Sequence, residues 1–350
     1  IRRPPRSTLD RSSAASDVYK RQIIYGTIET WEFDSWIIGF NKIYPDIKIE
    51  YSRKYVYGTP PPMSNQIKQD LSETGSSADI VFSAISPHLQ MLNQDLFQVY
   101  DSKERRNISE SFKDSEGLWT SVVLLPTIQI YNRDLIDKHD IPTSSENLLE
   151  NRWKNRISIH DVSLGTFGSN WLSSLRPSII DGNWDTFVNL LSKQNLQLWP
   201  LFRHVLGSVS LGKSDIGLTV MLYEYLRAKD KNLPVNRLVL SDIPVSVSAT
   251  AASILKTSNN LESAKLFIDY ILSKDGQNMI GNNYIRVPAY IDSNSQYSIS
   301  KLLPDEKYSI FPSSDVILNT DKDRELFQNL FKNQITQSEA FNTDVDKVLK

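Results

Sequence analysis

Hydroxyl residues recur where strands are predicted to end and helices to begin. Thr27 follows the first predicted strand, and Ser83 and Ser86 lie between an apolar strand and the next predicted helix. Helix amino termini carry unpaired N–H groups and a favourable dipole, so side chains at these places can help to hold an anion. Ser and Thr also cap helices without any ligand, and this simpler interpretation stays open.

A second polar segment, residues 165–169, combines two glycines, two hydroxyls and an aromatic ring ahead of a helical stretch. Gly165, Thr166 and Ser169 are suited to cradling an oxygen-rich group through exposed amides and hydroxyls. An ordinary connecting turn has the same composition, so the segment alone does not establish a ligand.

The residues used most often in catalysis show no recognised arrangement. The chain has no cysteine, and its four histidines, His88, His139, His160 and His204, are scattered. No HExxH, Walker or GxSxG motif is present, although a catalytic carboxylate pair cannot be judged in a chain with 23% charged residues. We therefore predict a protein without enzyme activity, without catalytic residues and without a cofactor, and we assign no metal-ligating residues.

Length and composition indicate a globular protein whose chain is longer than a single hydrophobic core usually accommodates. A chain of 350 residues favours two compact units, and 40% apolar with 23% charged residues is typical of a folded protein. A net charge of −2 with interspersed signs predicts no nucleic-acid partner. The longest apolar run in the middle, Val122–Leu125, stops at Pro126 and is too short for a membrane span.

The first 22 residues differ from the rest of the chain. They carry six basic and two acidic side chains and show no helical or strand periodicity. We predict that residues 1–22 are a non-native or disordered tail, similar to a translated sequencing-adapter sequence, and that order begins at Ile23.

From Ile23 the pattern alternates between strands and helices. The first β-α-β unit has a strand at residues 23–25, a helix containing Trp36 and Phe40, and a strand at residues 47–51. Such alternation predicts an α/β fold of mostly parallel sheets with helices on both faces and ligand sites at strand carboxyl ends. The later predicted strands are 78–82, 122–130, 157–160, 216–220 and 252–255, and the later helices are 64–72, 184–192, 222–228 and 261–273.

Several of these segments resemble, in the right order, the extracytoplasmic solute-binding proteins of ABC transporters. They include the 78–82 strand, LLPTIQIYNRDLI at 124–136, the stretch 147–172 with its glycine-rich loop, DIGLTVMLYEYL at 215–226, the segment 241–277, and Arg286-Val287-Pro288. The resemblance spans residues 23–290 and is nearest to the branch that includes ferric-iron and related anion binders.

The resemblance implies a two-lobed type II periplasmic-binding-protein fold with two crossover hinge strands. Lobe one would comprise residues 23–123 plus 245–350, with the final helix packed on it, and lobe two would comprise 124–244. Pro126 and Pro244 lie near the two crossovers, where a restricted φ can define hinge ends.

The resemblance also implies a ligand in the cleft between the lobes. It adds Tyr131, just past the crossover, Tyr223, after the 216–220 strand, and Arg203 to the candidate ligand-binding residues. An Arg fork can bind a carboxylate or phosphonate at two points. The interpretation of all three as ordinary core or surface residues stays open. The pair Arg53-Lys54 is a further cationic candidate. The ferric subgroup places adjacent tyrosines on the metal, whereas this chain has Tyr223-Glu224-Tyr225, so we assign no metal ligands.

The predicted function is therefore to bind a small solute and deliver it to an ABC transporter permease outside the cytoplasm, as a monomer. The ligand is expected to be a small anionic or oxygen-rich molecule, or a ferric ion. Two alternatives stay open: a sensory or regulatory module that uses the same fold, and an enzyme built on it.

Overall fold

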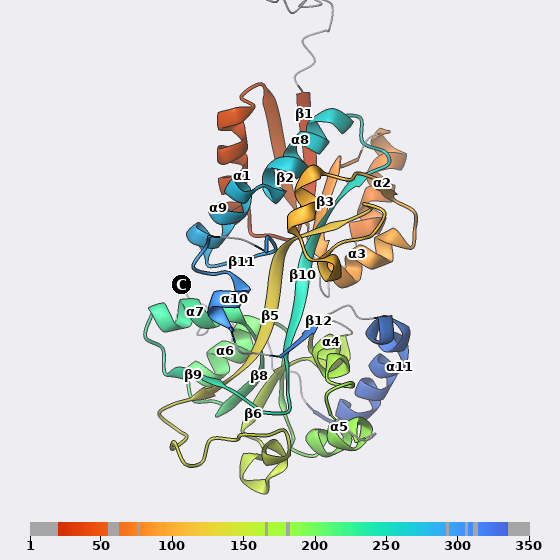
Figure 1. Ribbon diagram of the computed structural model, residues 1–350. Coiled ribbons are helices and arrows are strands. Elements are labelled where there is room, and N and C mark those ends of the chain that lie inside the picture. Colours follow the sequence, from red (N-terminus) through yellow and green to blue (C-terminus); the bar gives the residue numbers. More distant parts are fainter. Residues whose placement is uncertain are drawn as a thin grey trace, which may run out of the picture.

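The computed structural model describes residues 20–54, 63–75, 77–164, 167–179, 183–291, 294–304, 307–310 and 314–334 (Figure 1). The strands are β1 Lys20–Gly26, β2 Ile47–Arg53, β3 Ile80–Ala84, β4 Phe97–Gln98, β5 Thr120–Asn132, β6 Ile157–His160, β7 Gln197–Trp199, β8 Ile216–Met221, β9 Val235–Leu238, β10 Val245–Leu255, β11 Val287–Pro288 and β12 Tyr308–Ile310. The helices are α1 Thr30–Ile43, α2 Met63–Thr74, α3 Ile85–Leu92, α4 Phe167–Ser174, α5 Trp184–Ser192, α6 Phe202–Ser210, α7 Leu222–Asp230, α8 Leu261–Leu272, α9 Lys274–Tyr284, α10 Ile299–Leu302 and α11 Ser314–Phe331. Short 3-10 helices are η1 Lys103–Asn107, η2 Glu110–Phe112, η3 Glu146–Leu149, η4 Asn151–Trp153 and η5 Val162–Leu164.

Within these residues the strands join into one sheet with the order β2-β1-β3-β10-β5-β8-β6-β7. The outer pairs β1–β2, β1–β3, β6–β7 and β6–β8 are parallel, as predicted. The sheet is less parallel than expected at its centre, because β5 and β10 are antiparallel to each other, β10 is antiparallel to β3, and β5 is antiparallel to β8. These two long strands are the crossovers that the resemblance implied.

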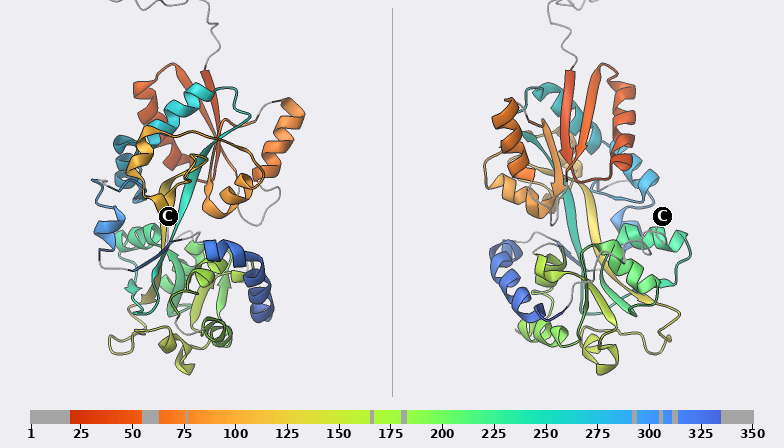
Figure 2. Two further views of the ribbon diagram at one scale, coloured as in Figure 1. Left: turned by 45° about the vertical axis from the view of Figure 1, so that its right-hand side comes forward. Right: turned by 180° about the vertical axis from the view of Figure 1, so that it is seen from behind.

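The elements gather into two lobes at the two ends of β5 and β10 (Figures 1 and 2). We call the part with β1–β3, α1–α3, α8 and α9 the first lobe, and the part with β6–β9 and α4–α7 the second lobe. The predicted two-lobed α/β fold is confirmed. The residue limits 23–123 with 245–350, and 124–244, stay a prediction.

Helices cover both faces of the first-lobe sheet because its strands alternate their side chains. Ile24 packs in one apolar cluster with Phe33 and Phe40 of α1, whereas Tyr25 packs in another with Ile67 of α2. In α1 the rings of Phe33, Trp36 and Phe40 are fully buried at helical spacing. This packing brings the amino terminus of α1 to the carboxyl end of β1, which faces the second lobe (Figure 1).

The predicted final helix exists but packs elsewhere than expected. Its residues contact α4, α5 and η5, and Phe327 and Phe331 belong to the apolar cluster of the second lobe. Asp323 accepts a hydrogen bond from Ser173 at 2.6 Å and pairs with Arg176. The expectation that this helix packs on the first lobe was wrong, because its apolar stripe fits the face left open by α4 and α5.

Strand β1 begins three residues before the predicted start of order. Lys20, Arg21 and Gln22 pair in register with β2, and Gln22 is fully buried. Arg21 also forms an ion pair with Glu50 at 2.5 Å. The prediction that order begins at Ile23 is therefore wrong by three residues. The prediction that residues 1–22 are a non-native tail stays untested, and residues 1–19 lie outside the described part of the chain.

The crossover β5 is buried along all 13 residues, because β10 covers one edge and other strands cover the opposite edge. That opposite edge pairs with β11 at Val123 and Leu124 and with β8 from Thr127 onward. Pro126 lies at this change of partner, a place where a residue without an N–H group interrupts no continuous ladder. Pro244 directly precedes β10, so both prolines lie near the crossovers as predicted.

None of the helices in the described ranges combines the length and the apolar character that crossing a membrane requires.

Candidate functional site

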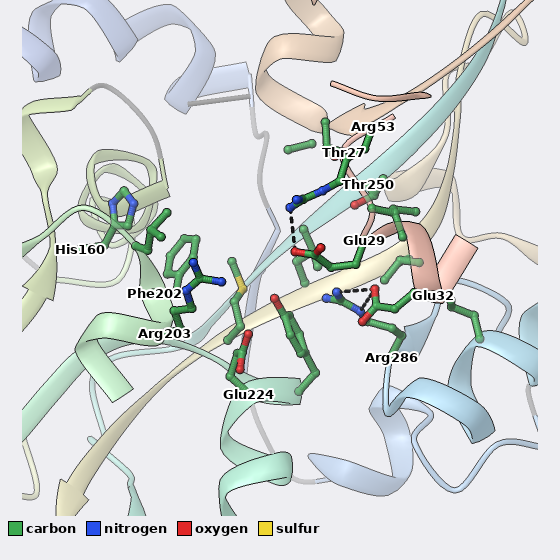
Figure 3. A pocket seen from close by; sticks show the side chains of 18 of the residues that line it. Thr27, Glu29, Glu32, Arg53, His160, Phe202, Arg203, Glu224, Thr250 and Arg286 are labelled. Carbon is green, nitrogen blue, oxygen red and sulfur yellow. Dashed lines mark hydrogen bonds and ion pairs between the residues drawn. The ribbon is translucent and has the colours of Figure 1, made fainter. Parts of the chain in front are cut away.

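A cavity of about 400 Å³ lies where the two lobes meet beside β5 and β10 (Figure 3). Both lobes and both crossovers contribute to its wall, which is the arrangement expected of a site between closing domains. The residues around it are Thr27, Ile28, Glu29, Glu32, Arg53, Lys54, Ala84, Val123, Leu125, His160, Leu201, Phe202, Arg203, Met221, Tyr223, Glu224, Thr250, Ile280 and Arg286.

The first-lobe wall is built from the carboxyl ends of β1 and β2 and the start of α1. Arg53 donates to Glu29 at 2.7 Å, and both side chains are partly exposed. The ammonium group of Lys54 lies 4.1 Å from the centre of the Tyr25 ring, and among the described residues no carboxylate pairs with it. Within the described ranges, the wall therefore presents a cation that no carboxylate pairs with.

The second-lobe wall comes from the ends of β6 and β8 and the starts of α6 and α7. The His160 ring stacks on Phe202 with centroids 4.6 Å apart. Arg203 and Glu224 extend into the cavity from this side (Figure 3). Cationic groups thus face the cavity from both lobes.

A buried carboxylate connects the two walls. Glu32 of α1 is fully buried and accepts from Arg286 Nε at 3.1 Å and Nη2 at 2.7 Å. Its other oxygen accepts from Arg227 Nη2 at 2.8 Å. The guanidinium of Arg286 lies 3.6 Å from the centre of the Tyr223 ring, so this pairing also fixes one side of the cavity.

Burial determines the protonation of several cavity groups. Burial raises the pKa of Tyr223 to about 12. Burial also raises the pKa of Glu224, although the positive charges of three nearby arginines act to lower it. Burial lowers the pKa of His160 to about 4, so its imidazole is neutral at pH 7. For Arg286, burial acts to lower the pKa, but Tyr223 and Glu32 outweigh it and the pKa rises.

Of the residues predicted from the sequence to bind the ligand, Thr27, Arg203 and Tyr223 line the cavity together. The cationic pair Arg53 and Lys54 lines it as well. Their contact with a ligand stays a prediction.

Ser83 lies outside the cavity lining, in the buried core between β3 and α3. Its Oγ is hydrogen-bonded to His88 Nδ1 at 2.8 Å, and His88 Nε2 is bonded to Ser253 Oγ at 2.7 Å. Burial lowers the pKa of His88 to about 3. Ser83 therefore satisfies a buried neutral histidine, and we leave it out of the proposed site.

The other predicted residues also lie outside the lining. Ser86 Oγ accepts from Asn170 Nδ2 at 3.0 Å, a contact between the two lobes. The buried Tyr131 hydroxyl accepts from Asn236 at 3.3 Å, and Ser169 is buried in α4. Gly165 and Thr166 lie outside the described residues.

No sequence pattern points to the residues with the most contacts at the cavity. Glu32 and Arg286 are 254 positions apart, and Glu32 looks like an ordinary acidic residue in the first turn of a helix. Glu224 stands out in the sequence only as the residue between Tyr223 and Tyr225. Only the packing of α1 against α9 brings the first two together.

Among the described residues, no group of three or more His, Cys, Asp or Glu side chains is arranged to hold a metal ion. The oxygen donors nearest to such a role are Tyr223 and Glu224, which both line the cavity. Tyr225 follows on the same helix but does not line the cavity, as expected for helix positions two residues apart.

Two lobes around a cavity define a cleft-type ligand-binding protein, and comparison with known proteins names its family. The family model described as "Bacterial extracellular solute-binding protein" matches residues 76–324, more than two thirds of the chain. The chain therefore belongs to the bacterial extracellular solute-binding proteins, a family of binding proteins.

Individual relatives are distant. The Fe(3+)-binding periplasmic protein of Serratia marcescens is 23% identical over 269 residues, which cover 75% of this chain and 76% of that protein. The apo ferric ion-binding protein A of Pasteurella haemolytica superposes with a TM-score of 0.74 at 16% identity, covering 91% of this chain and all of that one. The periplasmic binding protein AfuA of Actinobacillus pleuropneumoniae, with fructose-6-phosphate bound, gives a TM-score of 0.69 at 19% identity, covering 90% and 98%.

The buried histidines predict a loss of stability in mild acid. His88 and His160 stay neutral in the folded protein down to pH values of about 3 and 4, whereas unfolded histidine takes up a proton below about 6.5. The unfolded state then binds more protons, so the free energy of unfolding should fall as the pH drops below 6.5. For each histidine the slope rises from about 0.7 kcal/mol per pH unit at pH 6.5 to about 1.4 near pH 5. Urea unfolding at several pH values measures this slope. His88→Gln should reduce the slope, and an unchanged slope in that variant would contradict the assignment.

Proposed function

We propose that this protein captures a small, oxygen-rich anion between its two lobes and delivers it to the permease of an ABC transporter outside the cytoplasm. The observation that carries the proposal is the placement of cationic groups on both walls of one cavity. Lys54 and Arg53 belong to the first lobe and Arg203 to the second. An anion held between them would draw the lobes together, which couples binding to closure.

The balance of charge supports an anion with additional polar groups. Four cations, Arg53, Lys54, Arg203 and Arg286, line the cavity with three carboxylates, Glu29, Glu32 and Glu224. Glu29 pairs with Arg53 and Glu32 with Arg286, so these charges offset each other, and four cations against three carboxylates leave an excess of one positive charge. A phosphate or carboxylate group with neighbouring hydroxyls fits this set, because the cations receive the charge and Glu224 can accept from a hydroxyl.

A ferric ion is the second candidate. The Serratia relative is named for Fe(3+) binding, and Tyr223 with Glu224 supplies oxygen donors of the type that hard cations prefer. Against it, burial raises the pKa of Tyr223 to about 12, which opposes the ionised phenol that a metal needs. We therefore place the anion first.

Several further features of the proposal rest on the family and on the sequence. Members of the family are solute-binding proteins, which supports a role without catalysis and with a permease partner. The Serratia relative is periplasmic, which supports a location outside the cytoplasm. We also propose that the protein acts as a monomer with no nucleic-acid partner.

A thermal-shift screen tests the proposed ligand class. The panel contains phosphate, phosphonates, sugar phosphates, ferric citrate, thiamine, polyamines, neutral sugars and amino acids. A matching ligand at a hundredfold excess over its Kd stabilises the protein by about 2.7 kcal/mol, a rise of roughly 4 °C in Tm. We expect anions to give this shift. Stabilisation by polyamines or neutral sugars alone would contradict the proposal, and chemical conversion of the stabilising compound would indicate an enzyme.

A further inference from the structure

The carboxylate of Glu32 has partners from both lobes. Arg286, which follows α9 in the first lobe, binds one oxygen through two nitrogens. Arg227, on α7 of the second lobe, binds the other oxygen at 2.8 Å. One buried group is therefore shared between a fixed partner in its own lobe and a partner that belongs to the opposite lobe.

Other first-lobe groups also contact the Arg227 side chain. Arg227 Nη2 donates to the backbone carbonyl of Tyr284 at 2.9 Å. The guanidinium lies 5.4 Å from the centre of the Trp31 ring on α1. The Glu32 carboxylate, the Tyr284 carbonyl and the Trp31 ring of the first lobe therefore form a binding site for the cationic Arg227 side chain of the second lobe.

The two ends of this contact differ in exposure. The Glu32 side chain is 0% exposed, whereas that of Arg227 is 26% exposed. When the lobes separate, Arg227 can return to water, and Glu32 keeps its two bonds from Arg286. Opening therefore breaks the Arg227 contact with Glu32, together with the contact of Arg286 on the Tyr223 ring. Neither break leaves a buried charge alone, because Glu32 and Arg286 stay paired, so the Arg227 contact can form and break reversibly.

We propose that Arg227 is a closure latch, whose bonds to Glu32 and to the Tyr284 carbonyl stabilise the closed arrangement of the lobes. The bond from Asn170 to Ser86 also joins the lobes, but it is neutral and contributes less. The latch sets how much of the empty protein is closed. Its effect on ligand affinity rests on the proposed binding function, because apparent affinity scales with the binding-competent fraction.

Distance measurement between spin labels tests the latch without any ligand. The chain contains no cysteine, so Asn93→Cys and Lys193→Cys, both at exposed positions in different lobes, give one specific label pair. In this background Arg227→Met removes the guanidinium but keeps an aliphatic stem beside Trp31. We expect the ratio of the closed population to the open population, read from the distance distribution, to fall about tenfold or more.

Two further variants make the result specific. Arg227→Lys keeps the positive charge and should restore part of the closed population. Lys229→Met removes a cation from the same helix that bonds Asn236 within the second lobe, and it should leave the distances unchanged. Equal distance distributions in Arg227→Met and the unsubstituted protein, with both folded by circular dichroism, would overturn the latch. Because no ligand is present, this result is separate from the fate of the proposed function.

Discussion

Replacing Glu32 with glutamine is expected to lower the free energy of unfolding by about 3–5 kcal/mol. Glu32 is fully buried, and its two oxygens accept from Arg286 and Arg227. When Glu32 loses its negative charge, the Arg286 side chain, which is only 11% exposed, keeps its positive charge but loses its counter-ion. Breaking a buried pair by removing one partner is much more costly than removing a pair at the surface.

Urea unfolding of the two proteins measures this difference. The matched control is Glu262→Gln, which removes an 84%-exposed carboxylate that pairs with Lys265 on α8 and should change stability by less than about 0.5 kcal/mol. A loss below about 1 kcal/mol for Glu32→Gln would contradict the role of this carboxylate as the buried connection at the cavity wall.

Replacing Arg203 with alanine is expected to weaken binding of the anionic ligand by about 10- to 150-fold, the loss of one hydrogen bond to a charged group. Lys54→Ala should weaken binding to a similar degree from the opposite wall. Both effects are expected because the proposed anion bridges the lobes and is not held by one lobe alone.

Isothermal titration with the anion found by thermal shift measures both variants. Lys154→Ala, an exposed cation on the second lobe away from the cavity lining, serves as the charge-matched control. A strong effect in one variant with none in the other would show that a single lobe holds the ligand. Unchanged affinity in both would remove the cations from the proposed site.

The elements were predictable because their apolar periodicity is local. Strand β6 and helix α5 have the predicted bounds. The β1-α1-β2 unit follows directly from apolar residues that recur first at strand spacing, then at helical spacing, and then at strand spacing again. The crossover β10 was predicted only at its end, residues 252–255, since its earlier half, Val245–Ala251, mixes small and hydroxyl residues that resemble a loop. Pairing with β5 from Ser246 onward, and with β12 at Val245–Val247, makes that half a strand, and β3 pairs only from Thr250.

The cavity residues were predictable only where the end of a strand places them. Thr27 follows β1, and Tyr223 follows β8, so both line the cavity. Ser83 fits the same sequence rule, but a buried histidine five residues later takes its hydroxyl. The position of His88 relative to Ser83 depends on how α3 packs on β3 and β10, which no local pattern reports.

The central claim is that one solute is held between the two lobes in the cavity lined by Lys54, Arg203 and Tyr223. The most direct measurement is a crystal structure of the protein with the anion that raises its Tm. We predict that the charged group of the anion lies within hydrogen-bond reach of side chains from both lobes. An anion bound on an outer surface, with the cavity occupied by water, would contradict the account.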